Sequence, residues 1–221
     1  MSKKVHPYAH RLVILRDWKS RWFATDKKYA DFLRADIFIK DFLTKKLRSA
    51  FVSQIEIERS RKGARIIIRT SRPGVIIGRQ GEGAKKLKED LTKMMKKNNI
   101  VIPEDLKIDI FEVPNPDADA QIVALSVVEG LEKRMPFRRV MKQTLDKVMS
   151  AREVKGARIL LGGRLNGADM ARTEEVKKGS IPLQTFRADV DFARERANMS
   201  YGVIGIKVWI YKGEIFDKDN K

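Results

Sequence analysis

The stretch Val75-Ile76-Ile77-Gly78-Arg79-Gln80-Gly81 decides the fold of the first half of the chain: a short apolar turn leads into two glycines that bracket two polar residues. Glycine lets the backbone turn tightly and approach a ligand without a Cβ in the way. A long basic helix is predicted from about Glu82 to Asn98, so its N-terminal N–H groups and positive dipole end would face the loop. Together with the cation of Arg79, this pattern indicates a GxxG loop of the kind that clamps single-stranded nucleic acid.

Two other glycine motifs do not fit the sequence. A dinucleotide-binding fingerprint needs GxGxxG directly after a strand, whereas the glycines from Gly78 onward are spaced GxxGxG and a Pro-Gly pair precedes them. Gly162 and Gly167 have the first spacing of a phosphate-binding P-loop, but Ala168 stands where that loop needs lysine. An ordinary helix–helix turn stays open as an alternative for residues 78–81, because short patterns with two glycines are common.

The segments on either side of the loop give it a context. Apolar residues recur at steps of three and four and predict a helix from Lys28 to about Ser49. Alternation predicts strands at Phe51–Arg59 and Gly63–Thr70, and the tight basic turn between them predicts a hairpin. A third strand is expected at Leu106–Val113. The order helix, strand, strand, short helix, loop, helix, strand resembles that of a type II KH domain, which is an RNA-binding fold.

The segment Val113-Pro114-Asn115-Pro116-Asp117 is the best domain boundary, because two prolines in four residues disfavour a helix and hold the link extended. Beyond it, the pattern predicts helices at Ala118–Lys133 and Phe137–Ala151 and a short helix at Asn166–Thr173. Strands are predicted at Ala157–Leu161, Pro182–Asp191 and Val203–Tyr211.

The expected fold class is therefore α/β (α+β), in two domains. A basic N-terminal extension at 1–24 precedes a KH type II domain at 25–113. A C-terminal domain with two helices and a mixed β-sheet follows at 114–213, and a flexible tail at 214–221 ends the chain.

Composition points to a polyanionic partner. The 221 residues include 47 Lys and Arg against 29 Asp and Glu, which gives a net charge of +18. A chain this basic repels itself and requires negative charge in its surroundings. The cations are spread along the chain and no long apolar run accompanies them, so nucleic acid is favoured over a membrane. Cysteine is absent, which excludes disulfides, thiolate zinc sites and thiol catalysis.

The predicted helix Phe137–Ala151 has a basic side. Arg138, Arg139 and Lys142 fall together on it at about 100° per residue, and only Asp146 offers negative charge nearby. Three cations that face one way repel one another unless an anion faces them. The alternative is a solvated face, because runs of charge usually serve solubility.

A second basic set surrounds the glycines at 162, 163 and 167. Glycine-rich turns interleaved with arginine suit close contact with folded RNA, although plain turn chemistry explains the glycines equally well. The members of this set are Arg164, Arg172, Lys177, Lys178 and Arg187.

Four segments of the second half carry a specific family resemblance: Phe137–Lys142, Gly163–Glu174, Ile181–Asp189 and Tyr201–Ile210. In this order they resemble the bacterial form of the family of ribosomal protein three of the small subunit, and the resemblance covers nearly the whole chain. It implies a place in the head of the small subunit, near the point where messenger RNA (mRNA) enters. It also implies a cytoplasmic, ribosome-bound protein whose partners are ribosomal RNA (rRNA), mRNA and neighbouring head proteins, with no cofactor, no small-molecule substrate and no membrane.

The resemblance assigns roles to individual residues. Arg138, Arg139 and Lys142 match positions that line the channel for incoming mRNA and help to unwind it, while translocation rather than ATP pulls the strand. The RNA-binding loop of the KH domain corresponds to Gly78, Arg79, Gln80 and Gly81. The candidates for rRNA contacts are the basic residues Lys3, Lys4, Arg11, Arg164, Arg172, Lys177, Lys178 and Arg187.

No catalytic or metal-binding residues are expected. His6 and His10 are the only histidines, and Pro7 between them disfavours a shared helical face, so they offer too few ligands for a metal site. Asp189 and Asp191 share a face of a predicted strand, as a two-metal nuclease would require.

Ion pairing with Arg187 and Arg194 explains these two carboxylates more simply than catalysis. One alternative function stays open: a KH-type regulator of mRNA or small RNA that acts away from the ribosome. Such a regulator would leave small subunits in a high-salt wash, whereas a ribosomal protein would sediment with them.

Overall fold

The computed structural model describes residues 5–60, 63–98, 100 and 105–216. Backbone contacts divide these residues into two compact units. One unit is Trp18–Pro114, and the other joins residues 5–17 to the chain from Asn115 onward. The predicted extension at 1–24 is therefore not a separate part, because its described residues divide between the two units.

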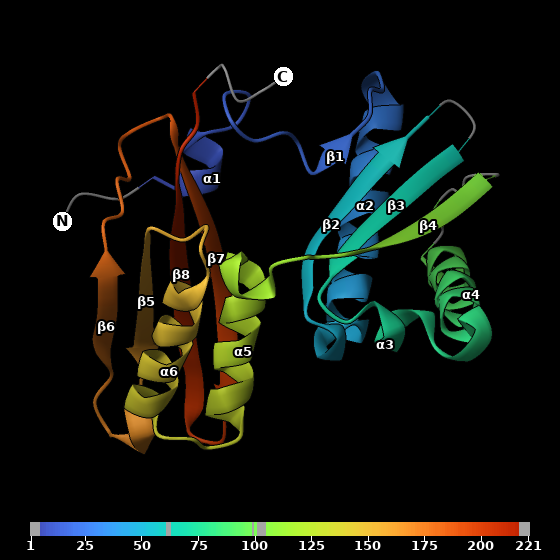
Figure 1. Cartoon of the computed structure of the whole chain (residues 1–221). Coiled ribbons are helices and arrows are strands. Elements are labelled where there is room, and N and C mark those ends of the chain that lie inside the picture. The colour runs from blue at the N-terminus through green and yellow to red at the C-terminus, as the bar shows by residue number, and fades with distance from the viewer. Residues whose placement is uncertain (1–4, 61–62, 99, 101–104, 217–221) are drawn as a thin grey trace. The chain divides into compact units, whose positions relative to one another are not determined.

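The unit Trp18–Pro114 has the predicted KH order of elements (Figure 1). Its helices and strands are β1 (Ser20–Arg21), α2 (Asp26–Lys46), β2 (Val52–Arg59), β3 (Gly63–Thr70), α3 (Pro73–Ile77), α4 (Glu82–Lys97) and β4 (Asp105–Glu112). Among the described residues, the strands form one sheet in the order β1-β2-β3-β4. β2 and β3 form the predicted antiparallel hairpin, whereas β3 pairs with β4 in parallel.

Strand alternation places one face of this sheet against the helices. Ile57, Ile66 and Ile68 point to that face and are fully buried. The helices add buried apolar residues at steps of four to the same cluster, namely Ala35, Ile39, Leu43, Leu87, Leu91 and Met95. The opposite face carries ion pairs instead: both carboxylate oxygens of Glu56 are occupied, one by Arg21 at 2.6 Å and one by Arg69 at 2.8 Å.

A buried polar network fixes the start of this unit. Asp36 of α2 is 3% exposed, and its Oδ2 accepts a hydrogen bond of 2.8 Å from Trp22 Nε1. Its Oδ1 accepts two bonds from the Arg59 guanidinium, at 2.6 and 3.0 Å. Every polar atom of this buried carboxylate thus has a partner, as burial requires. The network explains why residues 18–24 pack with the KH unit although their sequence shows little periodicity.

The second unit is a four-stranded sheet, within the described residues, in the order β6-β5-β8-β7. All three pairings are antiparallel, so the prediction of a mixed sheet is wrong while the α/β class is confirmed. The elements after the boundary are α5 (Ala120–Glu132), α6 (Phe137–Ser150), β5 (Gly156–Gly163), β6 (Arg172–Gly179), β7 (Ala188–Met199) and β8 (Gly202–Glu214).

Helices α5 and α6 cover one face of this sheet (Figure 1). Asp119 starts α5, because its Oδ1 accepts hydrogen bonds from the backbone N–H groups of Gln121 and Ile122. The core joins buried residues of both helices to inward residues of the strands, including Val123, Val127, Phe137, Met141, Leu145, Ile159, Leu161, Ile206 and Val208.

Two element predictions in this unit are wrong. The short helix predicted at Asn166–Thr173 is only a 3-10 turn at Leu165–Gly167, and β6 begins at Arg172. β6 gave no strand signal because it is an edge strand in which only Val176 packs against the core. The strand predicted at Pro182–Asp191 begins at Ala188, because the residues before it make turns.

Arg11 corrects another prediction. It was a candidate for rRNA contact, but its side chain is fully buried in the second unit. The guanidinium donates to five backbone carbonyls, those of Pro7, Pro182, Leu183, Thr185 and Ala188. Arg11 thereby joins the short helix α1 (Pro7–His10) to the irregular loop before β7, and its charge is not available to a ligand.

Asp189 and Asp191 are structural, although not with the expected partners. Asp189 pairs with Arg16 at 2.5 Å, and Asp191 Oδ2 accepts a hydrogen bond from the N–H of Ala120 at the start of α5. Burial disfavours the charge of Arg16, but the carboxylates outweigh it and raise the pKa of the guanidinium. The predicted partner Arg187 pairs with Glu214 instead.

We expect Arg11→Met to destabilise the second unit by about 3 kcal/mol, because buried carbonyls lose charged donors and one methionine cannot replace them. Hydrogen exchange across residues 182–214 in the full chain measures this loss of protection. Arg194→Met on the exposed side of β7 removes the same charge without buried contacts and serves as the control. Equal protection in the two variants would contradict the anchoring role of Arg11.

Candidate nucleic-acid interface

The predicted GxxG loop lies between α3 and α4 and has a left-handed backbone at three positions. Gly78, Gln80 and Gly81 have φ values of 69°, 52° and 79°. The glycines adopt these angles without strain, whereas Gln80 does so at a cost that glycine or asparagine would avoid. The result is a tight 3-10 turn at Arg79–Gly81 that runs directly into α4.

Gly83 is a further residue on which the loop depends. Only its position after the two glycines of the motif marked it in the sequence. A Cβ at this position would lie 2.5 Å from the carbonyl oxygen of Ile76 and 2.9 Å from that of Ile77. These distances are too short for any side chain, so only glycine lets the first turn of α4 approach the end of α3 this closely. The signal was available in the sequence as a third glycine two residues after the motif.

The loop presents its polar residues outward. Arg79 and Gln80 are exposed, and within the described residues neither makes an ion pair or a side-chain hydrogen bond. Gly81 occupies the N-cap of α4 and has no side chain to satisfy the first N–H groups of the helix. Those groups and the helix dipole favour a negatively charged ligand at this position.

The surroundings of the loop combine charge with apolar surface. Val75 and Ile77 of α3 are 59% and 39% exposed, although they belong to the apolar part of the motif. Lys46 at the end of α2 donates a hydrogen bond to Asp90 of α4 and lowers the pKa of that carboxyl, so this acid is already paired. An exposed cation, the positive end of the α4 dipole and apolar surface suit a stretch of unpaired nucleic acid, with phosphates at the loop and bases beside it.

Helix α6 presents the second predicted group of cations. Phe137, Val140, Met141, Leu145 and Val148 are buried on one side of the helix. On the other side, the three cations of the predicted channel group, Arg138, Arg139 and Lys142, are exposed. Sequence periodicity therefore placed this group correctly on the outer side of a packed helix.

Local acids neutralise only one of these three cations. Glu174 of β6 lies 3.6 Å from Arg138 of α6 and 3.1 Å from Arg172 of its own strand. The sequence did not reveal this contact between α6 and β6. Asp146, the acid expected beside Lys142, pairs with Lys178 at 3.3 Å. Within the described part of the chain, Arg139 and Lys142 thus keep their charge without an acidic partner.

The remaining rRNA candidates differ in whether other groups of the protein already occupy their side chains. Arg164 donates to the carbonyls of Ala168 and Tyr201 and pairs with Asp169, so it holds a turn together. Lys177 is exposed, and strand alternation directs it away from α6, on the face opposite Glu174 and Val176. Lys3 and Lys4 lie outside the described residues.

Metal and membrane sites find no support where the structure can be described. No cluster of three or more histidine, cysteine, aspartate or glutamate side chains there could hold a metal ion. None of the helices among these residues combines the length and apolarity needed to cross a bilayer.

The fold and its loop define the first half of the chain as a KH domain, and the family model described as "KH domain" matches residues 39–118. A model described as "Ribosomal protein S3, C-terminal domain" matches residues 127–210. The chain is 45% identical to small ribosomal subunit protein uS3 of Clostridium novyi over 97% of its own length and 94% of that protein. It is 47% identical to the uS3 of Pseudomonas paraeruginosa, over 97% of the chain and 91% of that protein.

A third relative, the uS3 protein of Xanthomonas euvesicatoria, is 45% identical over 98% of this chain and 86% of its own length. The chain therefore belongs to the small ribosomal subunit protein uS3 family. The family predicted from the sequence is confirmed, and so is the prediction that the chain is not an enzyme, since these relatives are ribosomal proteins.

Replacing Gly83 by alanine tests the packing of the loop. We expect Gly83→Ala to destabilise the KH unit by about 2 kcal/mol, because the new methyl group overlaps two backbone oxygens and must displace α3 from α4. Gly74→Ala is the matched control, since nothing lies within 4 Å of a Cβ there. Urea unfolding with hydrogen exchange in α4 compares the two, and equal stability would show that α3 and α4 do not need this close approach.

Proposed function

We propose that this chain is a structural constituent of the small-subunit head that binds rRNA and lines the channel through which mRNA enters. Its membership of the uS3 family supports a structural and RNA-binding role in the small subunit. A cytoplasmic, ribosome-bound location and contacts with neighbouring head proteins belong to the same proposal.

The exposed side of α6 carries the proposal for mRNA. Arg139 and Lys142 have no acidic partner among the described residues, and Arg138 shares Glu174 with Arg172 at 3.6 Å. Cations that local acids leave unneutralised attract a phosphate backbone without regard to its sequence. Every message has this backbone, so such a site suits a strand that changes with each transcript.

Helix α6 also suits the proposed unwinding of incoming mRNA. Five of its residues are buried in the core of the second unit, so the cations project from a fixed base. A strand whose phosphates are held along a fixed row of cations cannot easily return to its paired form. The work of opening a duplex then comes from the movement of the strand, and the protein needs no nucleotide.

Replacing Arg138, Arg139 and Lys142 by alanine should slow translation of messages with a hairpin by severalfold more than translation of unstructured messages. The reason is that the cations on α6 matter most where the strand must be held open. Reconstituted translation with the two kinds of message measures the ratio of rates.

The matched control for this experiment is the replacement of Arg194, Arg196 and Lys207 by alanine, which removes the same charge from exposed positions of β7 and β8. We expect this control to slow both messages alike. Equal slowing of both messages by the α6 variant as well would contradict its place in the channel, while leaving the ribosomal role intact.

The KH loop allows a separate test of RNA binding. Replacing Arg79 and Gln80 by aspartate should weaken binding of single-stranded RNA to the full chain at low salt, because two carboxylates then stand where phosphate must lie. The slope of log affinity against log salt should also fall by about 0.7 for each phosphate that the loop no longer neutralises. Unchanged affinity and slope would exclude this loop from RNA binding by the free protein.

A further inference from the structure

A cavity of about 320 Å³ in the second unit lies beside the channel group of α6. Three separate turns enclose it: the α5–α6 turn, the turn after β5 and the β7–β8 hairpin. Its lining residues are Leu131, Arg134, Met135, Pro136, Phe137, Asn166, Met199, Tyr201 and Ile204. Phe137 is also the first residue of α6, so the cavity directly adjoins the helix turn that carries Arg138 and Arg139.

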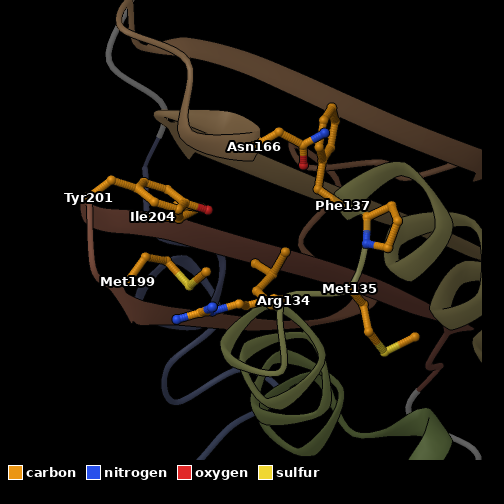
Figure 2. A pocket seen from close by; sticks show the side chains of 9 residues that line it. Arg134, Met135, Phe137, Asn166, Met199, Tyr201 and Ile204 are labelled. Atoms are coloured by element: carbon orange, nitrogen blue, oxygen red, sulfur yellow. The ribbon is translucent and has the colours of Figure 1, made fainter.

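The lining combines flat rings with a few polar groups. Figure 2 shows the Tyr201 ring, the Phe137 ring, the Asn166 amide and the Arg134 guanidinium around the same space. A Cβ added at Gly167 would lie 3.7 Å from the Tyr201 ring, so the turn after β5 passes close to this ring. Aromatic and guanidinium planes stack on nucleobases, and a carboxamide can both donate to and accept from a base edge.

Two lining residues have an unusual backbone. Arg134 and Asn166 have φ values of 60° and 56°, in the left-handed region that glycine adopts most easily. Arg134 follows the end of α5, where its N–H donates to Leu131 O, a position at which glycine is the common residue. An arginine there places a cation at the cavity in spite of the backbone strain.

Electrostatics favours an anionic polymer over a protein side chain. None of the nine lining residues, all of them in the described chain, is acidic. The acids in the adjacent segments are engaged: Glu132 accepts a hydrogen bond from the N–H of Asn198, and Asp169 pairs with Arg164. Arg134 is exposed and has no acidic partner within residues 5–216 as far as they are described, so it adds its charge to that of Arg139 and Lys142.

We propose that this pocket receives one unstacked base of an RNA strand whose backbone passes over Arg134 and the cations of α6. The base stacks on Tyr201 at the mouth of the pocket, the Asn166 amide contacts its edge, and the buried Phe137 ring contributes to the apolar floor. This inference rests on the proposed function, because it assumes that RNA reaches the exposed side of α6. The pocket would thus hold one base out of its stack, in addition to the phosphate contacts made by the cations of α6.

Isotope-labelled methionine methyl groups give a direct test in the full chain. Met135 and Met199 line the pocket, whereas Met170 is 84% exposed outside it and Met95 is buried in the KH unit. Addition of hexaadenylate at low salt should change the NMR chemical shifts of the Met135 and Met199 methyl groups through the ring current of the bound base. The change should level off as the site fills. Tripolyphosphate supplies phosphate without a base and should leave both signals in place.

Variants test the individual contacts. Tyr201→Leu should weaken hexaadenylate binding about tenfold because the base loses a stacking partner, whereas Tyr201→Phe keeps the ring and the affinity. Asn166→Asp preserves a residue type that tolerates the left-handed backbone and should abolish the methyl shifts by placing a carboxylate in the pocket. Its control is Gln184→Glu, which adds the same charge at an exposed position. Gln184 lies in the loop before the start of β7, whereas the pocket lies at the other end of that strand.

The outcomes separate the pocket from the proposed function. If hexaadenylate binds and the Met135 and Met199 signals do not move, the pocket proposal is overturned while RNA binding stands. If N-acetylphenylalaninamide moves these signals and hexaadenylate does not, the occupant is a protein side chain and the proposal is likewise overturned. If the chain binds no RNA at low salt, the proposed function fails as well.

Small subunits that carry Asn166→Asp identify the source of the base. Chemical probing of the rRNA should reveal one base that becomes reactive if the occupant is ribosomal. Loss of crosslinks from a thiouridine-labelled message, with an unchanged rRNA pattern, would assign the occupant to mRNA. Subunits that show neither change contradict the proposal in the assembled particle.

Discussion

Burial of one side of each basic helix is the constraint on which the functional surface depends. Leu87, Leu91 and Met95 hold α4 against the KH sheet, and a longer apolar row holds α6 against the second sheet. Since side chains on a helix are fixed in direction by the backbone, burial of one side determines where the cations of the other side point. The positive charge of this chain is therefore arranged by its apolar residues.

The structure sorts that charge into two kinds. Arg11, Arg59 and Arg164 serve the fold, because carbonyls or carboxylates already occupy their donors. Arg139 and Lys142 have no such partner within the described chain and remain available to an external anion. A net charge of +18 thus overstates the charge that RNA can meet at any one surface, and the pairing of each side chain is the better guide to its role.

Sequence patterns predicted most of the fold because most elements bury a periodic apolar face. The KH order, the hairpin and both helices of the second unit follow from such patterns, with bounds that differ by only a few residues. β6 escaped prediction because an edge strand with a single core contact has almost no hydrophobic alternation. The paired strand directions of the second sheet depend on contacts distant in sequence, which no local pattern contains.

The two candidate RNA surfaces could be predicted from the sequence to different degrees, because they depend on different kinds of contact. The α6 group depends on side-chain charge at fixed angles around a helix, and periodicity alone reveals it. The KH loop depends on how closely two backbones approach, and Gly83 acquires its importance only when α3 and α4 are seen together. Arg11 is the extreme case, since its five carbonyl partners come largely from a loop more than 170 residues away. A cation that binds the protein itself and a cation that binds RNA have the same sequence signal, and only the tertiary contacts distinguish them.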